Sequence, residues 1–251
     1  MAEAVIRLRN LTKVYKLPGF LKSKEIRGIE DLSFEVKEGE IFGLLGLNGS
    51  GKTTTLRCLV GLLKPTSGLA EVFGKSAYQD ARIRSELGYL PENLSFSPHL
   101  SAGEILTLFA RLDRPKFPTP SVIHSRIQEV LEVVGLSQMA KRATRTYSKG
   151  MNQRLGIAQA ILHHPSILVL DEPASGLDPL GIVEMRELFL KLNRDFRITV
   201  LFSSHSIGEV EKVSHRVAIV ARNRLNRVLE KSQWQNSGKT LEDCFLEEVR
   251  I

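Results

Sequence analysis

The sequence contains little cysteine and has no long hydrophobic run. Only two cysteines, Cys58 and Cys244, occur in 251 residues, which is too few for a disulfide framework and unlike metal-ligand spacing. No apolar run approaches the roughly 18 to 20 residues that a membrane-spanning helix needs. The N-terminal segment MAEAVIRLRN lacks the apolar core of a signal peptide. We therefore expect a soluble, cytosolic chain that folds as one large domain or two small lobes.

Basic residues outnumber acidic ones and give a formal net charge of +7 with a pI near 9.5. Such a chain attracts anionic partners, for example nucleotide phosphates, acidic lipid headgroups or nucleic acid. The basic residues are scattered, however, and no long basic run is interleaved with aromatic residues. A solvated surface explains this pattern better than a nucleic-acid interface does, so no nucleic-acid partner is expected.

A glycine-rich motif follows the apolar stretch at residues 41–45. The segment GLNGSGKTT at residues 46–54 matches the pattern G-x-x-x-x-G-K-[ST]. Its glycines let successive backbone N–H groups converge on phosphate oxygens, and the helix behind them adds free N–H groups and the positive end of a dipole. A glycine-rich turn that binds nothing is the alternative, but the preceding strand and the following helix favour a phosphate cradle.

Two side chains of this motif have specific expected roles. Lys52 is expected to reach the β- and γ-phosphates of a nucleoside triphosphate, and the Thr53 hydroxyl is expected to ligate Mg²⁺. The expected ATP-binding residues of the motif are Gly46, Leu47, Asn48, Gly49, Ser50, Gly51, Lys52, Thr53 and Thr54.

Apolar strands alternate with helices in the two ends of the chain. Expected strands lie at residues 5–8, 14–16, 32–36, 69–73, 167–170, 198–202 and 217–220. A basic surface loop with Pro18 and Gly19 is expected at 17–27. Helices are expected at 151–163 and from the N-cap Asp178 to about residue 193. This alternation is typical of a parallel α/β core.

The middle of the chain is almost entirely helical. Ser101 and Glu104 have the spacing of a capping box. The residues that follow at helical intervals are Ile105, Leu108, Phe109 and Leu112. A second helix is expected at 122–134, ending at Gly135. The helical middle is therefore an insertion between the two halves of the α/β core.

Two adjacent carboxylates end the apolar strand at 167–170. Asp171 is expected to hold Mg²⁺ directly or through water, and Glu172 to polarise the water that attacks the γ-phosphate. The alternative is a pair of exposed acids at a strand-to-loop boundary. The phosphate-binding motif upstream favours the catalytic interpretation.

Together these motifs resemble the ATP-binding subunit of an ABC transporter, and the match extends along nearly the whole chain. Residues 147–154, YSKGMNQR, resemble the family signature LSGGQ, which is often followed by QR. Ser148 and Gly150 are kept, whereas Lys149 and Met151 depart in a form that resembles the branch serving ABC-2 type exporters. The resemblance implies that Ser148 and Gly150 face the γ-phosphate of ATP held by a second subunit. An ordinary helix N-cap is the alternative for Ser148.

The resemblance assigns roles to four more positions. His205 stands where the family places a switch histidine that contacts the γ-phosphate. Tyr15 stands where the family stacks an aromatic ring on adenine, although packing at a strand end is the alternative. Residues 175–178 resemble the D-loop that crosses the dimer interface. Glu92 stands where the family has a glutamine that touches Mg²⁺ or the water; glutamate keeps an oxygen ligand but adds charge and removes the amide donor.

The resemblance implies a P-loop NTPase fold of the α/β class. A RecA-like core with a small antiparallel β subdomain is expected over residues 1–91 and 152–225, an inserted helical subdomain over 92–151, and a C-terminal extension over 226–251. The implied protein is an ATPase that uses ATP and Mg²⁺ and pairs with a second, identical or related, ATP-binding subunit. It would drive the membrane permease of an exporter from the cytoplasmic face.

Two other classes of protein stay open at this point. One is a soluble ABC-type ATPase without a permease, such as an iron–sulfur assembly or nucleic-acid-associated ATPase. The other is a nucleotide-binding regulatory module without turnover, against which Glu172 and His205 argue. This sequence does not identify the transported substrate, because a permease forms the transport pathway.

Overall fold

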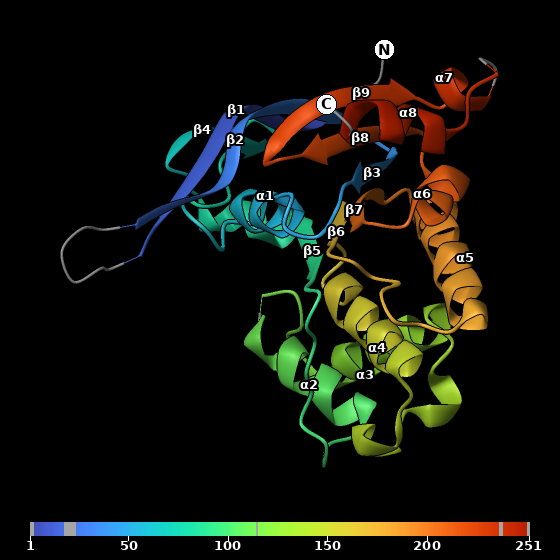
Figure 1. The fold of residues 1–251 in the computed structure, drawn as a ribbon. Helices are drawn as coiled ribbons and strands as arrows, with labels where there is room; N and C mark the ends of the chain where they lie inside the picture. Colours follow the sequence, from blue (N-terminus) through green and yellow to red (C-terminus); the bar gives the residue numbers. More distant parts are fainter. Residues whose placement is uncertain (1–2, 18–23, 114, 236–237, 250–251) are drawn as a thin grey trace. The chain divides into compact units, whose positions relative to one another are not determined.

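The computed structural model describes residues 3–17, 24–113, 115–235 and 238–249 (Figure 1). Two compact units are present: the first comprises Met1–Arg84 and Thr199–Ile251, and the second comprises Ser85–Ile198. The helical subdomain expected at 92–151 falls inside the second unit. Its bounds, like those of the RecA-like core, stay a prediction.

A three-stranded antiparallel sheet forms one part of the first unit. Its strands are β1 (Ala4–Leu17), β2 (Lys24–Lys37) and β4 (Ser67–Val72), in the order β2-β1-β4. The helix α1 (Lys52–Leu59) packs against β2 and β4 (Figure 1). This sheet is the expected antiparallel β part of the fold.

Two expectations for this sheet were wrong. The strands expected at 5–8 and 14–16 are one continuous strand, β1. The loop expected at 17–27 is shorter, because β2 begins at Lys24 and its residues pair with the end of β1, for example Ile26 with Tyr15. Pairing with β1 satisfies the backbone of these charged residues, which carry no apolar alternation of their own. Pro18 and Gly19 lie outside the described residues.

A second sheet in the first unit carries the phosphate-binding motif. The strand β3 (Ile41–Leu45) lies between β7 (Thr199–Ser204) and β8 (Arg216–Ala221), parallel to both, and β9 (Arg224–Glu230) is antiparallel to β8. Every residue of β3 and β7 is buried, as expected for central parallel strands. The expected strands at 198–202 and 217–220 are confirmed with ends shifted by a residue or two.

Three helices complete the first unit. The helix α6 (Ile207–Val213) packs against β3 and β7, α7 (Ser232–Gln235) against β9, and α8 (Leu241–Val249) against β8 and α6. Part of the C-terminal extension expected from residue 226 is therefore the strand β9, which begins at Arg224.

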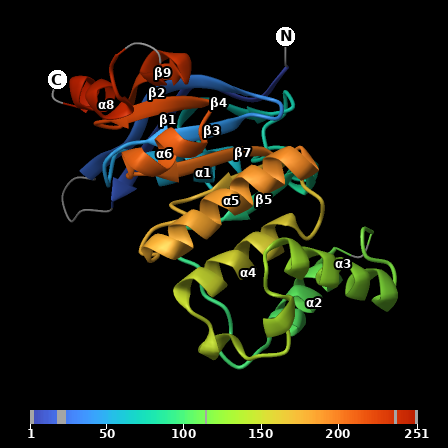
Figure 2. The same cartoon turned by 90° about the vertical axis from the view of Figure 1, so that its right-hand side faces the viewer.

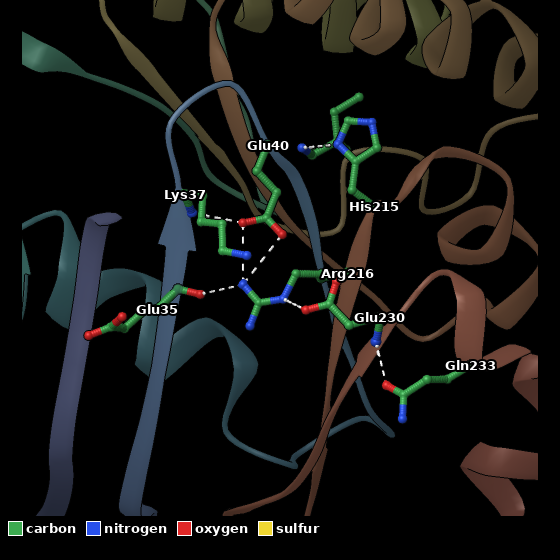
Figure 3. A network of polar contacts seen from close by, with 8 residues as sticks. Glu35, Lys37, Glu40, His215, Arg216, Glu230 and Gln233 are labelled. Atoms are coloured by element: carbon green, nitrogen blue, oxygen red, sulfur yellow. Dashed lines mark hydrogen bonds and ion pairs between the residues drawn. The ribbon is translucent and has the colours of Figure 1, made fainter. Parts of the chain in front are cut away.

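A polar network lies at the amino end of β3 (Figure 3). The Arg216 guanidinium lies 3.5 Å from the Glu40 carboxylate and 2.9 Å from that of Glu230. Burial raises the pKa of Glu40, and the nearby Arg216 opposes that effect. The N–H of Ile41 donates to Nδ1 of His215 at 3.0 Å. These contacts fix the start of the strand that leads into the phosphate-binding motif.

The second unit contains a parallel strand pair and four helices. The strands are β5 (Leu87–Leu90) and β6 (Ile167–Leu170), and the whole of β6 is buried. The helices are α2 (Ala102–Leu112), α3 (Pro120–Val133), α4 (Lys149–Ile161) and α5 (Pro179–Phe196). The helices α2, α3 and α4 pack against one another (Figure 2).

The expected start of α2 is confirmed, and its apolar residues are only partly buried. The Ser101 hydroxyl accepts the Glu104 N–H and the Glu104 carboxylate accepts the Ser101 N–H, which is a complete capping box. Ile105 is buried as expected. Leu108, Phe109 and Leu112 are instead exposed, with Leu112 83% exposed, because Leu106 and Ala110 supply the rest of the packed face.

The ends of α3 and α4 follow from local chemistry. Gly135 has a φ of +69°, a left-handed conformation that suits glycine just beyond a helix, as the sequence predicts. The helix α4 begins at Lys149, two residues before the expected start, because Ser148 is its N-cap. At the other end of α4, the buried Arg126 of α3 donates from Nε to the Leu162 carbonyl at 2.9 Å. Both ends of α4 are therefore fixed.

Candidate functional site

The phosphate-binding motif lies between the carboxyl end of β3 and the start of α1. The N–H of Gly46 donates to the Ser204 carbonyl at 3.3 Å, so the turn leaves the sheet beside β7. The Lys52 side chain is buried within the motif, and its Nζ donates to the carbonyls of Gly46 at 2.7 Å and Leu47 at 3.2 Å. The loop thus folds around its own lysine, with the ammonium at the centre of the turn.

Two glycines of the motif have no room for a side chain. A Cβ on Gly46 would lie 2.3 Å from the Val220 carbonyl oxygen. Gly51 has a φ of +102°, and a Cβ there would lie 2.5 Å from the Gly28 carbonyl oxygen. The Ser50 Oγ is buried and has no hydrogen-bond partner among the described residues. The turn is therefore tightly packed on the protein side.

The start of α1 suits an anion. Its N-cap is Gly51, which makes no side-chain capping bond, and the first turn holds no acidic residue. The first N–H groups of a helix have no partner within the helix, and the dipole makes that end positive. Phosphate oxygens fit this combination of N–H groups and the Lys52 ammonium. The geometry agrees with the expected nucleotide site.

Tyr15 occupies a slot beside the motif. Its hydroxyl lies 3.1 Å from the Thr54 Oγ1, and the Lys13 ammonium lies over its ring at 5.5 Å. A Cβ on Gly28 would come within 2.6 Å of the Tyr15 ring. Sequence reasoning missed Gly28, which directly follows the loop expected at 17–27. The only signal was a glycine inside an otherwise continuous strand.

His205 lies next to the same motif. It follows directly on β7, whose last residue Ser204 pairs with Leu45 of β3. The histidine side chain is exposed. The Ser204 hydroxyl accepts the Ser206 N–H at 3.0 Å, which fixes the turn around His205. Within the first unit, the structure therefore brings Tyr15, the phosphate-binding motif and His205 together.

The two predicted carboxylates follow β6 in the second unit. Asp171 is fully buried and Glu172 is 6% exposed, so the alternative of two exposed acids is wrong. The N–H of Asp171 donates to the Leu90 carbonyl at 2.9 Å. Glu172 has a φ of +48°, a strained conformation for a residue other than glycine. Buried acids on strained backbone are typical of functional sites.

Glu92 lies at the same edge of the second unit. It follows β5 by two residues, and the parallel pairing of Leu90 with Leu170 brings the carboxyl ends of β5 and β6 together. The Glu92 side chain is exposed. The register agrees with the expected neighbourhood of Glu92 and Asp171.

The signature-like turn is exposed at the start of α4. The Ser148 hydroxyl accepts the Met151 N–H at 3.2 Å, so the N-cap alternative describes a real contact. A Cβ on Gly150 would lie 3.8 Å from the side chain of Leu177, and one on Gly176 would lie 2.3 Å from the Lys149 amine. The turn therefore packs on the loop at 175–178, which resembles the D-loop. Sequence reasoning noted Lys149 only as a departure and missed this contact.

Asp178 performs the capping role that the sequence predicts. Its carboxylate accepts the N–H of Gly181 at 2.7 Å, and Pro179 is the first residue of α5. The cap fixes the point at which the loop at 175–178 ends.

Comparison with known proteins identifies the family. Residues 29–175 match the family model described as ABC transporter. The chain belongs to the ABC transporter family. As an ATP-binding protein of this family it is an ATPase with a P-loop NTPase fold, in agreement with the sequence-based prediction.

Several relatives of this ABC protein are named for transport. It is 42% identical over 224 residues to the bacitracin transport ATP-binding protein BcrA of Bacillus licheniformis, covering 88% of this chain and 68% of that protein. The BcrA of Enterococcus faecalis is 36% identical, covering 89% of this chain and 68% of that protein. YhcH of Bacillus subtilis, an uncharacterized ABC transporter ATP-binding protein, is 41% identical with coverages of 89% and 69%. The chain thus spans about two thirds of the length of these relatives.

Solved structures of ABC cassettes share the fold. A dimeric post-hydrolysis state of the ATP-binding cassette MJ0796 bound to ADP and Pi has a TM-score of 0.79 at 25% identity, covering 90% of this chain and 98% of that one. Another dimeric structure of MJ0796, a bacterial ABC transporter cassette, has the same TM-score at 26% identity and the same coverages. Among the described helices of this ABC protein, none has the length and hydropathy of a membrane span.

The described residues of this ABC protein include oxygen donors of the kind that Mg²⁺ prefers. No cluster of three or more His, Cys, Asp and Glu side chains in the described residues could hold a metal by itself. The Thr53 hydroxyl in the first unit and the buried Asp171 carboxylate in the second are each an oxygen of the kind that Mg²⁺ prefers, together with water and phosphates. The donor chemistry therefore fits a metal that arrives with ATP.

Proposed function

We propose that this chain powers an ABC exporter by closing head to tail with a second ATP-binding subunit, identical or related, over two ATP molecules. Each site would combine Lys52, Thr53, Asp171, Glu172 and His205 of one subunit with Ser148 and Gly150 of the other. Hydrolysis would reopen the dimer, and the movement would reach a membrane permease. The chain would then lie at the cytoplasmic face of the membrane, held there by the permease.

The observation that carries this proposal is the signature-like turn. Ser148 and Lys149 are exposed, and a Cβ on Gly150 would have within 4 Å, among the described residues, the Leu177 side chain at 3.8 Å and the Ser148 Oγ at 3.9 Å. The first turn of α4 holds no acidic residue, as an anion-binding helix start requires. A capped, positive helix end on the surface suits a phosphate presented from outside the subunit. The dimeric MJ0796 structures are consistent with such pairing.

On this proposal, the residues of the chain divide the work of hydrolysis. The ATP phosphates lie on the N–H groups of residues 46–54, and Lys52 neutralises charge on the β- and γ-phosphates. Glu172 accepts a proton from the attacking water while the water oxygen forms a bond to the γ-phosphorus. The bond from that phosphorus to the β–γ bridging oxygen breaks, and ADP leaves. Mg²⁺, held by Thr53 and Asp171, would supply further charge neutralisation of the phosphates.

The remaining assignments complete the nucleotide site. His205 would donate a hydrogen bond to the γ-phosphate from the turn after β7. Tyr15 would stack its ring on the flat face of adenine, because an aromatic side chain can stack on any base. Glu92 would touch the metal or the water, at the edge it shares with Asp171. An exporter is favoured over an importer by the bacitracin transport relatives and by the form of the signature-like turn.

The substitution Glu172→Gln tests the dimer and the base together. The variant keeps the shape and one oxygen of the side chain but cannot accept the proton. We expect ATP binding to persist, turnover to fall by about 100-fold or more, and ATP to trap a dimer visible by light scattering. Hydrolysis at the wild-type rate would exclude Glu172 as the base. Tight ATP binding without any dimer would exclude the shared site.

The permease is proposed to contact the exposed face of α2. Leu108 is 52% and Leu112 83% exposed, and a groove beside them is lined by Leu108, Arg111 and Ile127. Neighbouring exposed apolar side chains mark surfaces that bind partners. Leu108→Glu with Leu112→Glu should abolish co-purification of an integral membrane protein from detergent extracts, with thermal melting as the control for folding. Retained co-purification would place the contact elsewhere. Failure of the unaltered chain to retain any membrane protein would favour a permease-free ATPase.

A further inference from the structure

Lys149, one of two residues that depart from the family signature, packs on the loop at 175–178. A Cβ on Gly176 would lie 2.3 Å from the Lys149 Nζ, 3.4 Å from its Cε and 3.7 Å from its Cδ. The end of the lysine side chain therefore lies against Gly176. Gly176 has a φ of +67°, so a side chain there is disfavoured by conformation as well as by space. The contact requires both the long stem and the glycine.

The loop beneath Lys149 starts at the predicted catalytic carboxylate. The N–H of Ser175 donates to the Glu172 carbonyl at 3.1 Å, and the N–H of Leu177 donates to the Ala174 carbonyl at 3.2 Å. These overlapping turns connect Glu172 to Leu177 through short-range bonds. A shift of the loop at Gly176 is therefore transmitted to the backbone of Glu172.

Charge does not explain why a lysine occupies this position. Lys149 is the first residue of α4, where the helix dipole disfavours a cation. Within the described part of the chain, its amine makes no hydrogen bond or ion pair. What its side chain does make is the packing contact with Gly176, in which the amine and the last two carbons of the side chain lie against the glycine.

We propose that Lys149 is a positioning residue that ties the signature turn to the loop that follows Glu172. This inference rests on the proposed dimer, in which Ser148 serves the ATP of the other subunit while Glu172 serves the ATP of its own. The contact of Lys149 with Gly176 then links the two ATP sites through one subunit. Loss of the stem uncouples the sites without altering the phosphate-binding motif.

The contact itself is tested by hydrogen exchange on the full chain without nucleotide. In Lys149→Gly we expect the amides of Ser175 and Leu177 to exchange roughly fivefold faster, because the packing that holds their turns is gone. Lys149→Met keeps an apolar stem and should retain the protection. Lys141→Gly, at another exposed lysine of the second unit, is the matched control and should leave both amides unchanged.

The coupling is tested by the ATP dependence of hydrolysis. In the wild-type chain the Hill coefficient should approach about two, the number of linked sites, and in Lys149→Gly it should fall towards about one. Lys149→Met and Lys141→Gly should keep the wild-type value. The affinity of the monomer for ATP should be the same in all four proteins.

Each outcome decides the matter. Unchanged exchange in Lys149→Gly overturns the contact. Faster exchange with an unchanged Hill coefficient overturns the coupling. If Glu172→Gln never dimerises with ATP while Lys149→Gly still shows faster exchange, the proposed dimer fails and the coupling fails with it, whereas the contact stands.

Discussion

Two helices begin at predicted phosphate-binding motifs, and their starts are built differently. The start of α1 has Gly51 as its N-cap, no side-chain capping bond and the buried Lys52 as its first residue. The start of α4 has Ser148 as its N-cap, with the hydroxyl accepting the Met151 N–H, and the exposed Lys149 as its first residue. The start of α1 is buried and has no side-chain cap. The start of α4 is exposed and is capped by the Ser148 side chain.

This difference separates the roles of the two motifs. The start of α1 has no side-chain cap, and its first N–H groups point to the end where phosphate is expected, so the motif at 46–54 gains stability when phosphate binds. The start of α4 needs no ligand, because Ser148 already satisfies one N–H. A hydroxyl that accepts one hydrogen bond can still donate another. Ser148 can therefore cap its helix and donate to a phosphate at once.

The largest expected effect is on ATP affinity and comes from removing the buried Lys52 ammonium at the start of α1. Lys52→Ala deletes a charge that would bond to phosphate, and such charge-assisted bonds are worth about 1.5 to 3 kcal/mol each. We expect ATP affinity, measured by calorimetry, to fall by roughly 10- to 150-fold. Lys75→Ala, on an exposed turn, is the control. Unchanged ATP affinity of Lys52→Ala would mean that the motif does not hold the phosphates.

A smaller effect is expected at the second start, and it can be divided into two parts. Ser148→Ala removes the cap and should lower the free energy of unfolding by about 1 kcal/mol. In the Glu172→Gln background it should also weaken ATP-driven dimerisation. Ser148→Asp keeps a capping oxygen but opposes a phosphate, so it should retain stability and still lose the dimer. If Ser148→Asp dimerises normally, the hydroxyl is only a cap.

Features that depend on neighbouring residues in the sequence were predictable. The phosphate-binding motif needs glycines and a lysine at fixed spacing, and the structure places Gly51 at a φ of +102° and Lys52 inside the turn. The capping box at Ser101 and the cap at Asp178 also rest on bonds that span three residues. Such bonds form within one turn of a helix, so the sequence alone determines them.

Features that depend on distant partners were missed. The strand β2 extends to Lys24 because β1 pairs with it, and the residues of this extension show no alternation of apolar and polar side chains that would predict a strand. The helical spacing of apolar residues in α2 does not say which of them are buried: Leu106 and Ala110 are buried, whereas Leu112 is exposed. Gly28 and Gly176 matter through Tyr15 and Lys149, each well separated in sequence or lying in another element. Their role is visible only once the chain is folded.

The smallest expected effect lies at the far end of β3, the strand that leads into the first start. His215 accepts the Ile41 N–H through Nδ1 at 3.0 Å, which requires that nitrogen to be unprotonated. Desolvation, and then the charge of Lys231, lowers the pKa of His215 below 6.5. The unfolded chain therefore binds the proton more readily than the folded one. The stabilising contribution is complete above about pH 6.5 and is lost as the pH falls below it.

The experiment compares wild type with His215→Gln, which has no titrating group at this position. The free energy of unfolding should fall further in wild type between pH 7.5 and 5.5, by less than about 1 kcal/mol, because solvent screens the exposed residue. His99→Gln, at an exposed histidine of the second unit, is the control. Identical pH profiles for wild type and His215→Gln would show that Ile41 keeps its bond, and that β3 supports the phosphate-binding motif independently of this histidine.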